Sequence, residues 1–290
     1  MLVGKITHNV GRFIQKCGDI VILAGQRYER AGAKPLVYYI RSVLRNGYLS
    51  AVERLFRRMR VTCPCCGWSG YSFRPFDMWR YYIPDSVCPH CGSHPRHRFL
   101  ELYISRRCQD ALEAGGHCLH VSPQREGRLR SKIKEIPGMK VFHTDVESFY
   151  LREIRDHCFL SDLTRMPAPS ETFDIVFCIH VLEHIREDRK ALAEIRRILR
   201  PGGTAFIMVP FGFESLKTTR ELDEPDVFGH VWHYQPDGVR ERLTDFEFSE
   251  VKAEDLLTPE DMRRYGVFHR EDPAVKDSCR EYMYHCVRPE

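Results

Sequence analysis

Two short cysteine-containing turns have the spacing of a metal site. Both have the form C-P-x-C-G and occupy residues 63–67 and 88–92. Two cysteines separated by two residues can hold one metal ion from a tight turn, and the following glycine tolerates the backbone conformation of that turn. Two such turns supply four thiolates, which close a tetrahedral zinc shell and leave no position open. The predicted zinc ligands are Cys63, Cys66, Cys88 and Cys91.

A disulfide pair or buried free thiols are the alternatives, but neither explains the repeated proline and glycine. Cys65 and His90 lie in the same two turns, and a four-thiolate shell needs neither. A closed zinc site is structural and says little about chemistry. The chain has twelve cysteines, no signal-peptide pattern and no run of eighteen apolar residues. These features predict a protein of a reducing compartment, the cytoplasm, without a spanning helix.

Charge and composition divide the chain into three parts. Residues 1–60 hold twelve Lys and Arg against three Asp and Glu, a net charge of +9, whereas the rest of the chain carries −5. Apolar residues in this part recur at helical spacing, so a basic helical segment is predicted. Its arginines either form a solvated face or attach the protein to an anionic membrane surface or to RNA. A zinc-knuckle module is predicted over 61–98, and the main domain over 99–290.

The main domain alternates apolar runs with helical patterns. Its candidate parallel strands are residues 117–121, 140–144, 173–179 and 203–210. A helix is predicted over 188–200, with Leu192, Ile195, Ile198 and Leu199 on one face. Segments 245–257 and 279–287 also have strand character. This order predicts an α/β fold, a Rossmann-like doubly wound sheet, whose ligands bind at the carboxyl ends of the strands.

One part of the main domain carries a family resemblance. The strand at 173–179, the V-L-E-H segment at 181–184 and the L-R-P-G-G turn at 199–203 resemble a class I S-adenosylmethionine-dependent methyltransferase. The resemblance implies that Asp145 takes the ribose hydroxyls and that Asp162 and Leu163 take the adenine. The resemblance also implies cofactor contacts from the loop after the first strand and from the segment after the strand at 173–179. These further cofactor-binding residues are Val121, Ser122, Pro123, Ile179 and His184.

The first loop departs from the usual pattern. In most of the family this loop contains G-x-G, which lets backbone approach the cofactor, but here residues 120–127 read H-V-S-P-Q-R-E-G. The chain is more similar to a bacterial branch that has a zinc module in front, an H-x-x-P-E loop and a later F-G…H-V…Y element, found here at 228–234. The missing glycines leave open a non-catalytic scaffold that no longer holds cofactor.

Methyl transfer depends mostly on alignment, and a base is needed only when the acceptor must lose a proton. His180 follows the strand that faces the methyl group, so it is the first candidate for that base, and His230 is the second. The favoured function is methylation of a small polar acceptor, such as a sugar of a surface glycan, with residues 1–60 at the inner membrane face. RNA methylation with recognition through the zinc module is the alternative enzyme.

Overall fold

The computed structural model describes residues 60–78, 81–108, 115–123, 133–152, 154, 157–211, 218–267 and 282–290. Its strands are β1 Val61–Thr62, β2 Ser69–Gly70, β3 Arg74–Met78, β4 Tyr81–Val87, β5 Gly116–Val121, β6 Met139–Asp145, β7 His157–Leu160, β8 Phe173–Ile179, β9 Leu199–Met208, β10 Arg220–Glu221, β11 Trp232–His233, β12 Glu247–Lys252 and β13 Tyr282–Val287. Its helices are α3 Pro95–Arg107, α6 Ser148–Leu151, η1 Leu182–His184, α7 Asp188–Ile198, α8 Pro236–Arg240, α9 Ala253–Leu256 and α10 Pro259–Tyr265.

By their contacts, the described residues form two units. Arg60 and residues 70–86 belong to the smaller unit, in which β3 and β4 pair as a two-stranded sheet. The larger unit contains 61–69 and the described residues from 87 to 290, and it includes all four predicted zinc ligands. The predicted domain limits at 60 and 98 stay a prediction, although α3 runs across residue 98. The basic helical segment predicted over 1–60 lies outside the described residues, except for Arg60.

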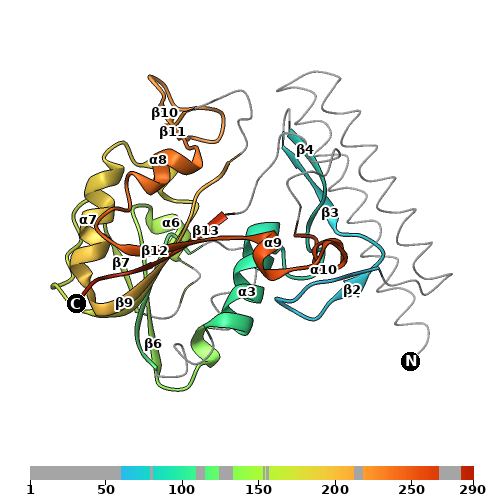
Figure 1. Cartoon of the computed structure of the whole chain (residues 1–290), viewed down its shortest axis with the longest axis horizontal. Helices are drawn as coiled ribbons and strands as arrows, with labels where there is room; N and C mark the ends of the chain where they lie inside the picture. The colour runs from blue at the N-terminus through green and yellow to red at the C-terminus, as the bar shows by residue number, and fades with distance from the viewer. Residues whose placement is uncertain are drawn as a thin grey trace. The chain divides into compact units, whose positions relative to one another are not determined.

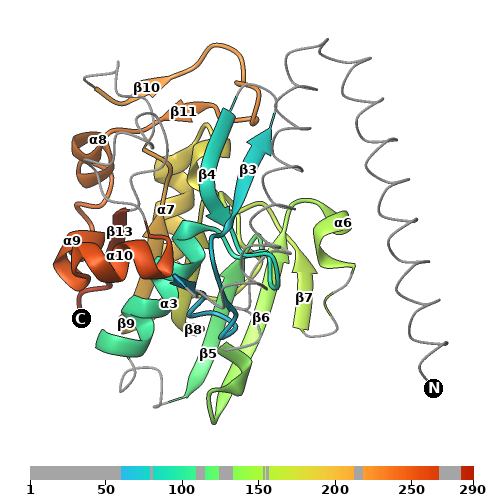
Figure 2. The ribbon, with the colours of Figure 1, turned by 90° about the vertical axis from the view of Figure 1, so that its right-hand side faces the viewer.

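A seven-stranded sheet organises the larger unit, with strand order β12-β13-β9-β8-β5-β6-β7 (Figures 1 and 2). Neighbouring strands from β9 to β7 pair in parallel, while β13 is antiparallel to both β9 and β12. Numbered by sequence within this sheet, the strands run 3-2-1-4-5-7-6. This is the doubly wound order with one antiparallel strand inserted near an edge. The Rossmann-like α/β fold predicted from the sequence is therefore confirmed.

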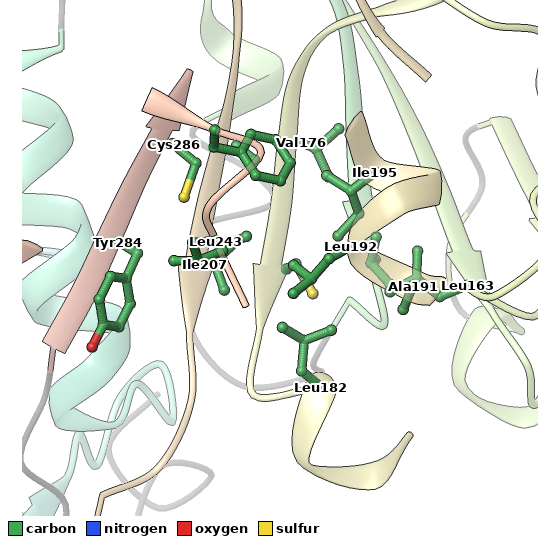
Figure 3. Close-up of a cluster of buried hydrophobic side chains, with 14 of the residues drawn as sticks. Leu163, Val176, Leu182, Ala191, Leu192, Ile195, Ile207, Leu243, Tyr284 and Cys286 are labelled. Atoms are coloured by element: carbon green, nitrogen blue, oxygen red, sulfur yellow. The ribbon is translucent and has the colours of Figure 1, made fainter. Parts of the chain in front are cut away.

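The two faces of the sheet pack against different helices, as the alternation of side chains along β8 requires. Val176 and Cys178 join a cluster with α7, whereas Ile175 and Phe177 join a cluster with α3, α9 and α10. Figure 3 shows the α7 side, where Leu192 and Ile195 point toward the sheet together with Leu182 and Leu243. Each fully buried aliphatic side chain stabilises the fold by roughly 1.5–3 kcal/mol. The central strands are apolar on both faces because both are covered.

The β8–α7–β9 unit follows the prediction closely. Strand β8 has the expected limits, and α7 begins at Asp188 as expected but ends at Ile198 instead of Arg200. Leu199 already pairs with Phe173, and the pairing resumes between Thr204 and Ile175 after an irregularity. The P-G-G turn is thus a bulge inside β9, and β9 ends at Met208, before the predicted limit at 210.

Two other expectations need correction. Strand β7 was not predicted from the sequence, because it has only four residues and these are partly exposed at the edge of the sheet. The strand expected over 245–257 ends at Lys252, where the Asp255 carboxylate accepts the Lys252 N–H and starts α9. In the last segment, β13 covers 282–287, and residues 279–281 lie outside the description. Within the described ranges, no helix combines the length and apolar character that crossing a bilayer requires.

An aspartate at the start of β8 ties three strands together. One Asp174 carboxylate oxygen accepts the His117 N–H of β5 at 2.7 Å. Both oxygens accept from Arg200 of β9, at 2.5 and 2.6 Å. A Cβ on Gly116 would overlap this carboxylate, and Gly116 also has φ +112°. Glycine is required at this position for space as well as for backbone conformation.

We predict that Gly116→Ala destabilises the protein more than Gly202→Ala, its matched control. Gly202 also has positive φ (+72°) but open space around it, so its alanine variant should lose only about 1 kcal/mol. Gly116→Ala should lose at least about 1 kcal/mol more, because the Asp174 contacts must shift. Urea denaturation of both variants measures the difference, and equal losses would show that Asp174 is not held as described.

Candidate active site and cysteine cluster

A cavity of about 780 Å³ opens at the carboxyl ends of the parallel strands. This volume lies within the range of small-molecule and cofactor sites. Eight of the predicted site residues line it: Val121, Ser122, Pro123, Asp145, Asp162, Leu163, His180 and His184. They lie at or just after the carboxyl ends of β5, β6, β7 and β8, which are adjacent in the sheet. The cavity therefore lies where a doubly wound sheet binds its ligands.

Ser122 and Asp145 line the cavity and are hydrogen-bonded to each other. Ser122 follows β5 with φ +46°, a left-handed conformation that is uncommon for residues other than glycine. Its hydroxyl donates to one Asp145 carboxylate oxygen at 2.8 Å, and the Glu147 N–H donates to the other at 2.8 Å. Asp145 is only 5% exposed. Each of its oxygens keeps lone-pair capacity for a ligand hydroxyl, so the carboxylate is oriented before anything binds.

The second predicted carboxylate follows the next strand. One Asp162 oxygen accepts both the N–H and the hydroxyl of Thr164, each at 2.8 Å, which closes a local turn. Leu163 in that turn is buried. The Ser161 N–H donates to the Asp145 carbonyl at 3.0 Å and connects the two carboxylate positions. The β6 and β7 ends thus present two acidic side chains to one cavity.

His180 sits at the opposite side of the strand ends, directly after β8. Its N–H donates to the Met208 carbonyl and its φ is +55°, so a second cavity residue is held in a left-handed conformation. The Nδ1 atom lies 3.6 Å from a carboxylate oxygen of Glu183, which is 1% exposed. Burial lowers the pKa of His180 well below its ordinary value, and the charge of Arg96 adds to this effect. The imidazole is therefore neutral at neutral pH.

Two of the predicted residues are not among the described residues that line the cavity. Ile179 is buried in the core cluster that contains α3. His230 lies behind His184, with ring centroids 4.9 Å apart, and burial lowers its pKa to about 4 against the opposing effect of Asp226. His184 itself is 42% exposed and donates from Nδ1 to the Gly229 carbonyl at 3.0 Å.

Other lining residues were not identified from the sequence. Arg96 comes from the first turn of α3, just after the second cysteine turn, and Phe228 comes from the segment between β10 and β11. Val146 and Tyr150 follow Asp145 and are exposed apolar side chains at the rim. The basic R-H-R run after Pro95 was a visible signal for Arg96. For Phe228, the only signal in the sequence was its position in the F-G…H-V…Y element.

The four predicted zinc ligands lie together. Their sulfur atoms are all within 4.8 Å of one another, with Cys63 Sγ to Cys91 Sγ at 3.7 Å and Cys66 Sγ to Cys88 Sγ at 3.8 Å. Tetrahedral zinc with Zn–S bonds of about 2.3 Å places its sulfurs about 3.8 Å apart. The glycine after each turn has φ near +72°, as these turns require. Cys65 is buried but is not a member of the group.

A buried arginine connects the cysteine cluster to the rest of the larger unit. The Arg98 guanidinium donates to the carbonyls of Ser93, Tyr265 and Gly266 at 2.5, 2.7 and 2.8 Å. The Ser93 hydroxyl in turn lies 3.1 Å from Cys63 Sγ. Burial lowers the pKa of Arg98 to about 10, and the nearby cysteine sulfurs oppose this shift. Arg98 therefore stays charged and joins the second cysteine turn to the end of α10.

Residues 126–207 match the family model described as "Methyltransferase domain". Residues 126–207 belong to a methyltransferase domain. The resemblance of the β8–α7–β9 segment to this family is confirmed by that match. A ubiquinone/menaquinone biosynthesis C-methyltransferase UbiE of Burkholderia mallei is 32% identical over 81 residues, which are 25% of this chain and 33% of that protein. The chain thus spans about a third of the length of the curated relatives that it matches.

Solved structures similar to the methyltransferase domain are related only distantly in sequence. An S-adenosylmethionine-dependent methyltransferase from Mesorhizobium loti has a TM-score of 0.44 and 13% identity, covering 62% of this chain and 96% of that chain. The [4+2]-cyclase SpnF has a TM-score of 0.43 and 17% identity, covering 63% of this chain and 81% of that chain.

We predict that Arg98→Lys destabilises the protein by about 2–4 kcal/mol. A single ammonium cannot reach three carbonyls held by a planar guanidinium, and a buried carbonyl left without a donor costs about 1–3 kcal/mol. Arg106→Lys is the matched control on the same helix, since its guanidinium is exposed and donates only to the Leu256 carbonyl at 3.1 Å among the described contacts. That variant should stay within about 0.5 kcal/mol of the parent protein in urea denaturation. Equal losses would contradict the bridging role of Arg98.

Proposed function

We propose that the protein is an S-adenosylmethionine-dependent methyltransferase that acts on a small polar acceptor. One observation carries this proposal. Two carboxylates from adjacent strand ends and a neutral imidazole from the other side converge on one cavity of about 780 Å³. A nucleoside cofactor needs the first two groups for its hydroxyls and base, and an acceptor that loses a proton needs the third.

The cofactor would lie along the strand ends. Asp145 would accept the ribose hydroxyls, because Ser122 and the Glu147 N–H already orient its oxygens. Asp162 and the buried Leu163 would contact the adenine. Ser122 has the left-handed backbone that a glycine would otherwise adopt, and in this conformation its backbone would approach the cofactor without the usual glycines. This conformation supports cofactor binding over the scaffold alternative.

The bound cofactor would supply an electrophilic methyl group. The protein's own contribution would be to align the acceptor and to take its proton. His180 can accept that proton because it is neutral, and the buried Glu183 carboxylate would stabilise the resulting imidazolium. His180 lies beyond the β5 end from the two aspartates, on the side where the sulfonium would point.

Polar groups beside His180 support a polar acceptor. Arg96 lines the same cavity and contributes to the electrostatic environment of His180. A sugar hydroxyl of a surface glycan fits these groups, and association of residues 1–60 with the inner membrane face is a separate proposal that rests on their charge of +9. The family match ends at residue 207, before the segment that carries Phe228. It therefore does not bear on the acceptor.

We also propose that the four cysteines bind a structural zinc ion. The support is the spacing of their sulfur atoms, which a tetrahedral Zn–S shell would require with little movement. All four positions would be filled by protein, so the ion would have no place for a substrate. Its contribution would be to hold the turn that leads into α3 and positions Arg96.

Asp145→Asn tests the cofactor site. The amide keeps the shape but loses the charge that the ribose hydroxyls would contact, so calorimetry with S-adenosylmethionine should show affinity about 10–100-fold weaker. Asp237→Asn, an 86% exposed carboxylate outside the cavity, is the control and should bind like the parent protein. No binding by the parent protein would support the scaffold, and unchanged binding by Asp145→Asn would place the cofactor elsewhere.

His180→Gln tests the base. With labelled cofactor and cell extract, the parent protein should label a glycan fraction, and the variant should lose about 100-fold or more in rate. Cofactor affinity should change little, because the imidazole would act on the acceptor. His117→Gln is the control, since His117 lies at the opposite end of β5. Label that appears only in RNA would contradict the sugar acceptor, and an unchanged rate for His180→Gln would remove its role as base.

A further inference from the structure

A second group of metal-ligand side chains lies outside the cysteine cluster. Asp226, His230 and His233 come from one eight-residue segment that ends in β11. Each offers one ligand atom, and these atoms all lie within 4.8 Å of one another. The three side chains are only 14–17% exposed. Two imidazoles and one carboxylate are a ligand set that Zn²⁺ and other first-row divalent ions use.

The carboxylate is held so that one oxygen faces both rings. Asp226 Oδ1 accepts the N–H groups of Phe228 and His230 at 2.8 and 2.9 Å. The other oxygen, Oδ2, lies 3.3 Å from His230 Nδ1 and 3.0 Å from His233 Nε2. Ligands bonded at about 2.0–2.1 Å to one ion are about 2.8–3.4 Å apart when adjacent, with octahedral geometry at the short end of this range and tetrahedral geometry at the long end. The observed separations fall in this range.

We propose that Asp226, His230 and His233 bind a divalent first-row metal ion, with Zn²⁺ as the first expectation. Only three protein ligands are supplied, so at least one coordination position would remain for water or for a ligand oxygen. These three residues would bind the ion whether or not the protein transfers methyl groups, and none of them belongs to the cysteine cluster.

The local fold gives a reason for such an ion. Strands β10 and β11 contain two residues each, so the connection between them depends on turns and on side chains such as Arg186, which donates to the Leu222 and Asp223 carbonyls. Short segments of this kind gain folding free energy from a bound metal. The connection carries Phe228, which lines the cavity, and its Gly229 carbonyl accepts from His184. An ion here would fix one wall of the cavity.

Two other arrangements compete with this proposal. In the first, both imidazoles donate N–H bonds to Asp226 and no ion binds. In the second, the ion uses Glu183, His184 and His230, whose ligand atoms also lie within 4.8 Å of one another. We favour the Asp226 group because both of its other members lie within 3.3 Å of the same carboxylate oxygen, whereas His184 Nε2 is 4.0 Å from Glu183.

Metal content and cobalt spectra of the full chain test the proposal. Protein stripped with a chelator and reconstituted under reducing conditions with Zn²⁺ or Co²⁺ should bind two ions per chain. One Co²⁺ ion should show thiolate-to-cobalt charge transfer from the cysteine cluster, and the other should show ligand-field bands without it. One ion per chain, with the thiolate signature alone, would overturn the proposal.

Variants locate the second ion. His233→Gln keeps an N–H donor for Asp226 but lacks the imidazole, so it should bind one ion and retain the thiolate signature, which also reports that the protein has folded. His157→Gln is the control, an exposed histidine on β7, and should bind two. His184→Gln should also bind two. Two ions in His233→Gln, or one in His184→Gln, would contradict the assignment.

Discussion

The parallel pairing of β5 with both β6 and β8 is the constraint on which the candidate site depends. Because parallel strands end at the same edge, Ser122, Asp145 and His180 must lie next to one another whatever else the chain does. The Asp174 carboxylate holds the opposite ends of β5, β8 and β9 in register. A slip of one residue would turn each of these side chains to the other face of the sheet.

The alignment of these strand ends requires left-handed backbone at two neighbouring positions, one after β5 and one after β8. Ser122 and His180 both have positive φ, although neither is glycine, and both line the cavity. Such conformations persist where surrounding hydrogen bonds enforce them, here from the carbonyls of Thr144 and Met208. These two positions hold the cavity geometry at some cost in stability.

The sequence predicted the central sheet because its strands are long apolar runs that both faces bury, as in 173–179. His180 was predicted because it directly follows such a run, whereas Asp145 and Asp162 were implied by the family resemblance. The sequence did not predict β7, which is short and half-exposed, or α9, whose start depends on one aspartate reaching back to Lys252. Arg96 and Phe228 reach the cavity only through tertiary packing, which no local pattern encodes. The cysteine cluster could be predicted because the two ligands of each turn lie only three positions apart in the sequence.

Strand order also bears on how the chain folds as it is synthesised. Strand β12 leaves the ribosome before β13, yet it joins the sheet only through β13, which lies between it and β9. Until residues 282–287 emerge, β9 has an open edge and β12 has no partner in the sheet. Completion of this side must therefore be a late event in biogenesis, and nascent chains would expose β9 to chaperones or to unwanted pairing.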